Sequence, residues 1–124
     1  MQLKVFLVDD SDVVCSGLEK MLTEIEGVSI IGKAKDVQGA VESISKLNPD
    51  VVILDIRLLN GSGIDVLKDI KKKKPSPVVL MLTNYPYPQY QQKCMELGAD
   101  YFLDKVTEIE KIPDIVSALK KKFS

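Results

Sequence analysis

Apolar residues alternate between two spacings along the chain. Short, nearly continuous apolar runs are typical of strands covered on both faces, whereas apolar positions three and four residues apart are typical of amphipathic helices. Five such runs predict strands at residues 4–8, 28–34, 51–54, 78–82 and 101–103. A helical pattern follows each run. Strand and helix repeated five times predict an α/β domain, a doubly wound parallel sheet with five helices on its two faces.

Start and stop signals bound the predicted helices. Asp36 is a suitable N-cap for the second helix, and Ser62 with Asp65 resembles a capping box for the third. Pro88 and Pro113 suit the first turns of the fourth and fifth helices. The connections are short, and no linker, repeat or low-complexity stretch interrupts them. We therefore expect residues 1–124 to form one domain.

Composition and charge exclude several classes of protein. The chain has 124 residues, 45% hydrophobic and 28% charged, with 17 basic and 18 acidic residues and a net charge of −1. This balance does not favour direct binding to nucleic acid or to an anionic membrane. The first apolar run stops at Asp9 and Asp10, and no run approaches the roughly 20 residues of a membrane span. We expect a cytoplasmic protein.

Histidine is absent from the chain, and cysteine is sparse. Without histidine there is no His-based metal site, no Ser-His or Cys-His catalysis and no phosphohistidine on this chain. Cys15 and Cys94 are isolated, so we interpret them as small buried side chains in a reducing compartment.

Polar residues follow four of the five predicted strands. Asp9 and Asp10 follow the first strand, Asp55 the third and Thr83 the fourth, and the fifth runs into Lys105. Ligands of doubly wound sheets bind at the carboxyl ends of the strands. If the first strand neighbours the third, three carboxylates converge there, and a hard divalent cation such as Mg²⁺ is their natural partner.

Lys105 and Thr83 complete a set of groups suited to phosphoryl transfer. A mobile positive charge and a hydroxyl donor are what the oxygens of a transferred phosphoryl group require. A carboxylate can itself act as the nucleophile and become an aspartyl phosphate. Each residue alone has an ordinary structural explanation, and the prediction depends on their occurring together, in order, at strand ends.

Four segments resemble the receiver domain of two-component signalling proteins, the CheY-like superfamily, over essentially the whole chain. They are VFLVDDSDVV, VVILDIRLLNGSGIDVL, VVLMLTN and GADYFLDK. The resemblance implies a flavodoxin-like sheet of order 2-1-3-4-5. It also implies a signalling switch that promotes only its own phosphotransfer and slow dephosphorylation, and so no enzyme with a separate substrate.

The resemblance also implies roles for individual residues. Asp55 would accept the phosphoryl group. Asp10 would bind Mg²⁺ directly, Asp9 would hold it through water, and the backbone carbonyl of Arg57 would complete the ligands.

Thr83 would form a hydrogen bond with a phosphoryl oxygen, and Lys105 would pair with the charge of the phosphoryl group. Phe102 occupies the aromatic switch position, whose movement would remodel the face of the fourth helix, fifth strand and fifth helix. The donor would be a histidine kinase or a histidine phosphotransfer protein, acting on an output partner that the sequence does not name. The face formed by the fourth and fifth helices is also a candidate homodimer interface.

Three positions depart from the family pattern. Val106 stands where proline usually follows the lysine in a cis peptide, and a non-proline cis bond costs about 2.5–4 kcal/mol. Leu59 stands where proline often precedes the glycine turn, which is expected to loosen the loop after Asp55. Tyr85 is bulky at a position that affects water access to the phosphate, so slow autodephosphorylation is expected.

The residues leave further interpretations open. Tyr85, Tyr87 and Tyr90 form either a packed, proline-stiffened loop or an aromatic patch that binds a partner. In the receiver fold, the helices carrying the two cysteines lie on opposite sides of the sheet, so no disulfide is expected.

Three rival functions must also be weighed. Asp10 and Asp12 imitate the nucleophile and acid of a haloacid-dehalogenase-type phosphatase, although Asp55 would then have no role. A flavodoxin is disfavoured because the acidic segment after the first strand would repel a phosphate. A pseudo-receiver, acting by docking alone, would have no use for the intact acidic residues. The aspartate that becomes phosphorylated distinguishes the first alternative from a receiver.

Overall fold

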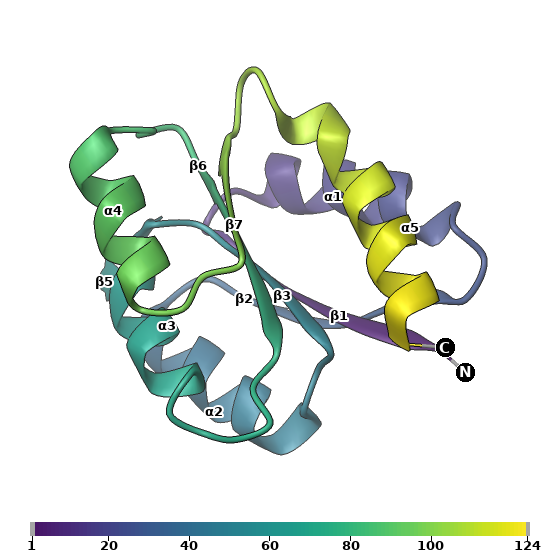
Figure 1. The fold of residues 1–124 in the computed structure, drawn as a ribbon, viewed down its shortest axis with the longest axis horizontal. Coiled ribbons are helices and arrows are strands. Elements are labelled where there is room, and N and C mark those ends of the chain that lie inside the picture. Colours follow the sequence, from purple (N-terminus) through teal and green to yellow (C-terminus); the bar gives the residue numbers. More distant parts are fainter. Residues whose placement is uncertain (1, 124) are drawn as a thin grey trace.

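A five-stranded parallel sheet organises the chain in the computed structural model, which describes residues 2–123 (Figure 1). Its order is β2-β1-β3-β6-β7, which is 2-1-3-4-5 when these five strands are counted along the chain, and the predicted order is confirmed. Each predicted strand is present, with ends that move by at most one residue. The strands are β1 (Leu3–Val8), β2 (Val28–Ala34), β3 (Val51–Leu54), β6 (Val78–Thr83) and β7 (Tyr101–Asp104).

Within residues 2–123, five α-helices cover the two faces of this sheet. Figure 1 shows α1 and α5 on one face and α2, α3 and α4 on the other. They are α1 (Asp12–Thr23), α2 (Val37–Leu47), α3 (Gly63–Ile70), α4 (Pro88–Glu96) and α5 (Ile112–Phe123).

Two of the predicted helix caps are present. The Asp36 carboxylate accepts a hydrogen bond from the Gly39 N–H at 2.7 Å, and the Ser62 hydroxyl accepts one from the Ile64 N–H at 3.1 Å. Each satisfies a backbone donor that the first turn of a helix leaves without an intrahelical partner. The helix starts predicted from these two residues are therefore confirmed.

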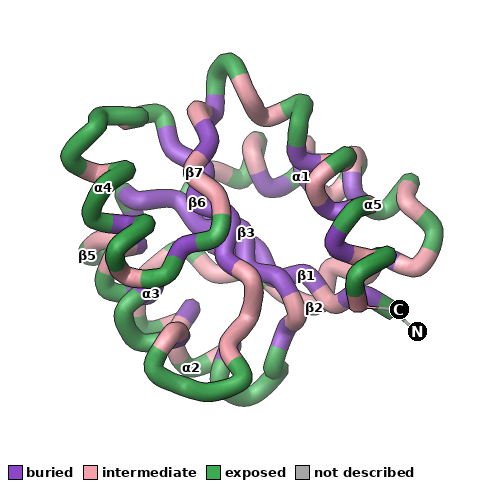
Figure 2. Tube along the Cα trace, viewed as in Figure 1, coloured by how far each residue is buried: buried purple, intermediate pink, exposed green. Residues whose placement is uncertain are grey.

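The central strands carry side chains into two separate cores. Along β1, Val5 and Leu7 pack with α1 and α5, whereas Phe6 and Val8 pack with α2, α3 and α4. Figure 2 shows the buried centre of the sheet between exposed outer helix surfaces. Since both faces are covered, nearly every position of the central strands is apolar, which explains the apolar runs in the sequence.

Two small elements were not predicted from the sequence. A hairpin of β4 (Arg57–Leu58) and β5 (Gly61–Ser62) follows β3, and a 3-10 turn, η1 (Ile109–Lys111), precedes α5. The Leu59 N–H donates to the Lys35 carbonyl oxygen at 3.2 Å, and the Gly63 N–H donates to the Ile56 carbonyl oxygen at 2.6 Å. These two hydrogen bonds anchor the ends of the loop, and its loosening by Leu59 stays a prediction.

Both cysteines are buried and free. Cys15 lies in the core beneath α1 and Cys94 in the core beneath α4, so the sheet separates them. Burial raises the pKa of the Cys94 thiol to about 11. Among the helices of residues 2–123, none is long and apolar enough to cross a membrane.

Candidate functional site

The carboxyl edge of the sheet gathers the buried polar groups of the domain. Among residues 2–123 the buried polar or charged side chains are Asp9, Asp55, Thr83 and Lys105. Asp9 and Asp55 follow the paired strands β1 and β3. Thr83 ends β6, and Lys105 follows β7, the strand paired with β6. Parallel pairing of neighbouring strands therefore brings together the four residues that the sequence places at strand ends.

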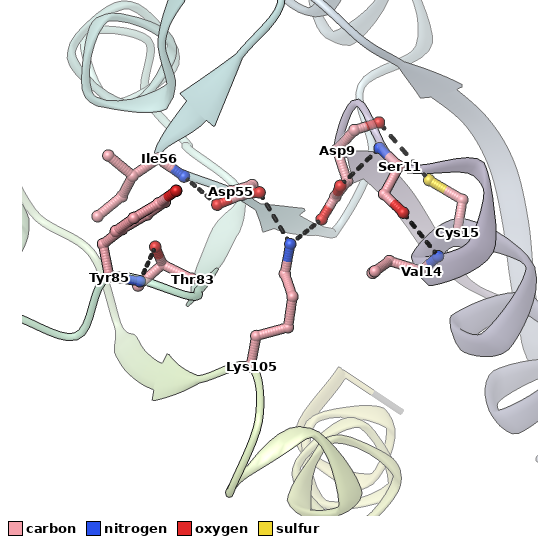
Figure 3. Close-up of polar contacts among 9 residues, drawn as sticks. All are labelled: Asp9, Ser11, Val14, Cys15, Asp55, Ile56, Thr83, Tyr85 and Lys105. Carbon is pink, nitrogen blue, oxygen red and sulfur yellow. Dashed lines mark hydrogen bonds and ion pairs between the residues drawn. The ribbon is translucent and has the colours of Figure 1, made fainter.

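Lys105 joins the two buried carboxylates. Its Nζ donates to Asp9 Oδ2 at 2.8 Å and to Asp55 Oδ2 at 2.9 Å (Figure 3). The Lys105 N–H donates to the Thr83 carbonyl oxygen at 2.8 Å, which fixes the lysine backbone beside β6. The sequence predicted Lys105 at this edge as a partner for phosphate, and it also neutralises carboxylate charge there.

The other carboxylate oxygens accept backbone hydrogen bonds. Asp9 Oδ1 accepts from the Ser11 N–H at 2.9 Å, and Asp55 Oδ1 accepts from the Ile56 N–H at 2.7 Å. Each buried carboxylate is thus oriented by one backbone donor and one ammonium donor. This arrangement holds both groups in one geometry before any ligand binds.

Burial and ion pairing act in opposite directions on the pKa values of this site. Burial raises the pKa of Asp55 and outweighs the hydrogen bond from Lys105, which lowers it. For Lys105, burial lowers the pKa, but the hydrogen bonds to Asp9 and Asp55 outweigh it, and the net direction is upward. Lys105 is therefore held in its charged form, whereas the Asp55 carboxylate is costly to keep ionised.

Three carboxylates lie close enough to share a cation. One oxygen from each of Asp9, Asp10 and Asp55 lies within 4.8 Å of the others, and Asp10 is exposed. With Lys105 positively charged and three carboxylates ionised, the cluster carries a net charge of −2. Hard oxygen ligands that are open to water on one side fit Mg²⁺, which keeps several of its waters.

Thr83 and Tyr85 lie beside Asp55, on the side away from Asp9 (Figure 3). Thr83 is fully buried, and its Oγ1 accepts a hydrogen bond from the Tyr85 N–H at 3.0 Å. In Figure 3 the Tyr85 side chain extends from Thr83 towards Asp55 and Ile56. The Tyr85 ring therefore lies near Asp55 (Figure 3), and its effect on the access of water stays a prediction.

The Arg57 side chain has a contact that sequence reasoning missed. Its guanidinium carbon lies 4.0 Å from the centroid of the Tyr85 ring, a cation–π geometry. The sequence analysis considered only the backbone carbonyl of Arg57. The available signal was positional, because Arg57 comes two residues after Asp55 and Tyr85 two residues after Thr83.

Two further predicted positions lie on β7 and directly after it. Phe102 is half-buried and packs against the core beneath α4, and its role as a switch residue stays a prediction. Within residues 2–123 the one cis peptide bond joins Lys74 and Pro75, so the peptide between Lys105 and Val106 is trans. The Val106 N–H donates to Asp104 Oδ1 at 2.9 Å, which closes a turn without a cis bond.

The structure does not support the phosphatase alternative, because Asp10 and Asp12 do not belong to one carboxylate cluster. Asp12 Oδ1 lies 3.0 Å from Lys35 Nζ, and Asp12 is not among the three clustered carboxylates. The hydrogen bond from Lys35 lowers the pKa of Asp12, which opposes a role as general acid. Asp55 instead occupies the centre of the site.

Comparisons with known proteins agree with this geometry. Residues 5–117 match the family described as the response regulator receiver domain. The chain is 36% identical over 120 residues to the sensory transduction protein LytT of Bacillus anthracis, covering 96% of this chain and 48% of LytT. It is 27% identical over 124 residues to the response regulator protein VraR of Staphylococcus saprophyticus, covering 100% of this chain and 58% of VraR.

Solved structures of the same fold include one described with a metal. The crystal structure of a CheX–CheY–BeF3–Mg complex from Borrelia burgdorferi matches with a TM-score of 0.84 and 29% identity, covering 94% of this chain and 88% of that one. The present chain spans about half the length of the two relatives above. Its sheet order, its acidic cluster with Lys105 and the match over residues 5–117 agree. The chain belongs to the response regulator receiver domain family and is not a classical enzyme.

Proposed function

We propose that this domain is a phosphorylation-dependent signalling switch that accepts a phosphoryl group on Asp55. The observation that carries the proposal is the ion-paired cluster in which Lys105 joins Asp9 and Asp55 beside Asp10. A buried charge cluster of this kind is costly to maintain, and perturbed carboxylates of this kind are concentrated at functional sites.

In the proposed reaction, a carboxylate oxygen of Asp55 attacks the phosphorus of a phosphohistidine or an acyl phosphate. A phosphorus–oxygen bond forms to Asp55 while the bond from phosphorus to the imidazole nitrogen, or to the carboxylate leaving group, breaks. The leaving group takes the bonding electron pair. Mg²⁺, held by Asp9, Asp10, Asp55 and the Arg57 carbonyl, would supply positive charge to the phosphoryl oxygens.

The residues around Asp55 have separate tasks in this proposal. Lys105 transfers its hydrogen bond from Asp55 to a phosphoryl oxygen and so keeps an anionic partner throughout. Thr83 Oγ1 accepts a bond from the Tyr85 N–H, which leaves its own proton available for a phosphoryl oxygen. The Tyr85 ring restricts the approach of water to the aspartyl phosphate, so that dephosphorylation is slow.

The partners follow from this chemistry. We propose a histidine kinase or a histidine phosphotransfer protein as the donor, in the cytoplasm. The face of α4, β7 and α5, with Phe102 as its switch residue, would control an output protein or an attached output domain. The names of the relatives, a response regulator and a sensory transduction protein, support such a role. Homodimers would form through α4 and α5, with residues 1–124 as one receiver domain.

Phosphorylation by acetyl phosphate tests the proposal directly. The protein is incubated with Mg²⁺ and acetyl phosphate, and the modified residue is located by mass spectrometry after borohydride reduction. We expect modification at Asp55, loss of modification in Asp55→Asn and retention of modification in Asp12→Asn. Labelling of Asp10, or equal labelling of the Asp55→Asn variant, contradicts the proposal. An unmodified wild-type protein supports a pseudo-receiver instead.

A further inference from the structure

Four side chains form a continuous set of contacts from the acceptor site to α4. The Arg57 guanidinium carbon lies 4.0 Å from the Tyr85 ring centroid. The Tyr85 and Tyr87 ring centroids are 6.2 Å apart with an interplanar angle of 53°, and those of Tyr87 and Tyr90 are 5.6 Å apart at 38°. Tilted rings at these separations attract one another. We call Arg57, Tyr85, Tyr87 and Tyr90 the tyrosine array.

One end of the tyrosine array lies at the acceptor. Arg57 is two residues after Asp55, at the start of the β4–β5 hairpin. The Tyr85 N–H donates to Oγ1 of the fully buried Thr83 at 3.0 Å. The first two members of the array therefore adjoin the acceptor site, Arg57 along the chain and Tyr85 through its hydrogen bond to Thr83.

The other end of the tyrosine array sets the start of α4. Tyr87 is the N-cap residue and provides no side-chain cap, unlike Ser11, Asp36 and Ser62 at other helices. Its carbonyl oxygen accepts from the N–H groups of Tyr90 and Gln91, both at 3.0 Å. Tyr90 packs into the core that also contains Phe102. Without a side-chain cap, the first turn of α4 depends on where Tyr87 is held.

The contacts of the array are weak enough to be exchanged. Cation–π and aromatic contacts of this kind are individually weak. A charge-assisted hydrogen bond between a guanidinium and an anionic oxygen is stronger. A phosphoryl group on Asp55 thus gives the Arg57 side chain a partner that competes with the Tyr85 ring.

We propose that Arg57 is shared between the Tyr85 ring and the phosphoryl group on Asp55, and that its transfer to the phosphoryl group loosens the first turn of α4 through Tyr85 and Tyr87. Arg57 is a positioning residue for Tyr85 in the resting state. Loss of its guanidinium from the ring, together with the turning of Thr83 towards the phosphoryl oxygen, frees Tyr85 and then Tyr87. The inference rests on the proposed function, because it requires a phosphoryl group at Asp55.

Amide hydrogen exchange at the start of α4 tests the proposal. Exchange at Tyr90 and Gln91 is measured by NMR with and without Mg²⁺ and beryllofluoride, a mimic of the phosphoryl group. In the wild type, we expect beryllofluoride to raise these exchange rates by about fivefold, the factor that corresponds to the loss of roughly 1 kcal/mol. In Arg57→Met, we expect raised exchange without beryllofluoride and a further change of less than about twofold.

Matched variants separate the array from general destabilisation. Tyr85→Phe keeps the ring and is expected to behave as the wild type, whereas Tyr85→Leu is expected to behave as Arg57→Met. In the double variant Arg57→Met/Tyr85→Leu the effects should not add, because both changes remove one contact. Tyr101→Phe, at a tyrosine outside the array, should keep the response at Tyr90 and Gln91.

The outcomes distinguish this inference from the proposed function. If beryllofluoride shifts the Asp55 and Thr83 resonances of the wild type but leaves exchange at Tyr90 and Gln91 unchanged, the array does not transmit the signal. If the effects of Arg57→Met and Tyr85→Leu on amide exchange add in the double variant, the inference is overturned as well. If beryllofluoride produces no shift at Asp55, and acetyl phosphate does not label that residue, both the proposed function and the inference fall.

Discussion

The two edges of the sheet use lysine in opposite ways. At the carboxyl edge, Lys105 is 8% exposed and bonds two buried carboxylates. At the amino edge, Lys73 is exposed, bonds the Ser45 hydroxyl at 2.7 Å and lies beside a cavity of about 470 Å³ that Ile44 and Ile70 also line. A lysine at an edge of the sheet is therefore no guide to function by itself. Burial and the number of anionic partners distinguish the two edges.

The two lysines also differ in how much their contacts contribute to the free energy of unfolding. Exposed polar contacts of lysine contribute about 0–1 kcal/mol, because water and salt replace them readily. Removing one partner of a buried ion pair costs about 3–5 kcal/mol, since a charge is left without compensation. A ligand at the carboxyl edge can therefore change strong ion pairs, those of Lys105 with Asp9 and Asp55. At the amino edge the exposed contact of Lys73 is weak, so a change there has little effect.

The largest expected effect comes from a methyl group placed at the carboxyl edge. In Gly63→Ala the new Cβ would lie 1.8 Å from the Asp55 carbonyl oxygen, a backbone atom that cannot move without moving the acceptor. We expect a loss of about 3 kcal/mol or more in the free energy of unfolding, measured by urea denaturation.

Gly98→Ala, in the turn that follows α4, provides the matched change. Its φ of +102° is unfavourable for alanine, but the nearest atoms are at 3.5 Å in the flexible Lys71 side chain. We expect a cost of about 1–2 kcal/mol from backbone strain alone. Equal losses in Gly63→Ala and Gly98→Ala would show that the carboxyl edge is not more tightly built.

Replacing the two lysines tests the comparison itself. Lys105→Met leaves Asp9 and Asp55 buried without their shared cation, and we expect a loss of about 3 kcal/mol at pH 7 without Mg²⁺. Lys73→Met should change the free energy of unfolding by less than about 0.5 kcal/mol. Urea denaturation of both variants measures the change in the free energy of unfolding. Similar changes in the two variants would show that the two edges do not differ in this way.

The pH dependence of Lys105→Met follows from the directions of the pKa shifts. Burial already raises the pKa of Asp55, and removing Lys105 raises it further. A raised carboxyl pKa favours folding at low pH, and that contribution is lost as pH rises from the unfolded value of 3.8 through the folded value. Lys105→Met should thus be less destabilising at pH 5 than at pH 8. The reverse trend would contradict the assignment of the ion pair.

Most of the fold was readable from the sequence, because strands buried on both faces leave continuous apolar runs. The site was readable because parallel strands bring their carboxyl ends to one edge, so Asp9, Asp55, Thr83 and Lys105 converge from widely separated positions. The β4–β5 hairpin was not readable, since two-residue strands have no periodicity. Nor was the contact of Arg57 with Tyr85, which depends on rotamers in two separate loops.

Magnesium binding is expected to have a smaller effect on stability. Its affinity should depend on Asp10 but not on the nearby Asp12. At a concentration 100 times its Kd, a ligand specific for the folded state raises the free energy of unfolding by about 2.7 kcal/mol. We expect Mg²⁺ to stabilise the wild type in this way. Asp10→Asn should weaken Mg²⁺ binding at least about tenfold, because a ligand charge is lost.

Asp12→Asn is the control for the magnesium experiment. Asp12 is paired with Lys35 and lies outside the carboxylate cluster, so its replacement should leave the Mg²⁺ affinity nearly unchanged. Calorimetric titration of the two variants measures both affinities. Equal weakening by the two substitutions would point to a diffuse acidic surface without a defined ion site.

The smallest effect expected has the opposite sign. Gly17 lies within α1, and a Cβ built there has no atom of another residue within 4 Å beyond its own helix backbone. Alanine has a lower entropy cost than glycine in a helix, so Gly17→Ala should stabilise the protein by about 0.5–1 kcal/mol. Thermal and urea unfolding measure this gain. The same added methyl group is thus expected to destabilise at Gly63, where a backbone atom is 1.8 Å away, and to stabilise at Gly17, where the space is open. A loss of stability in Gly17→Ala would mean that α1 is more closely packed at this position than the structure indicates.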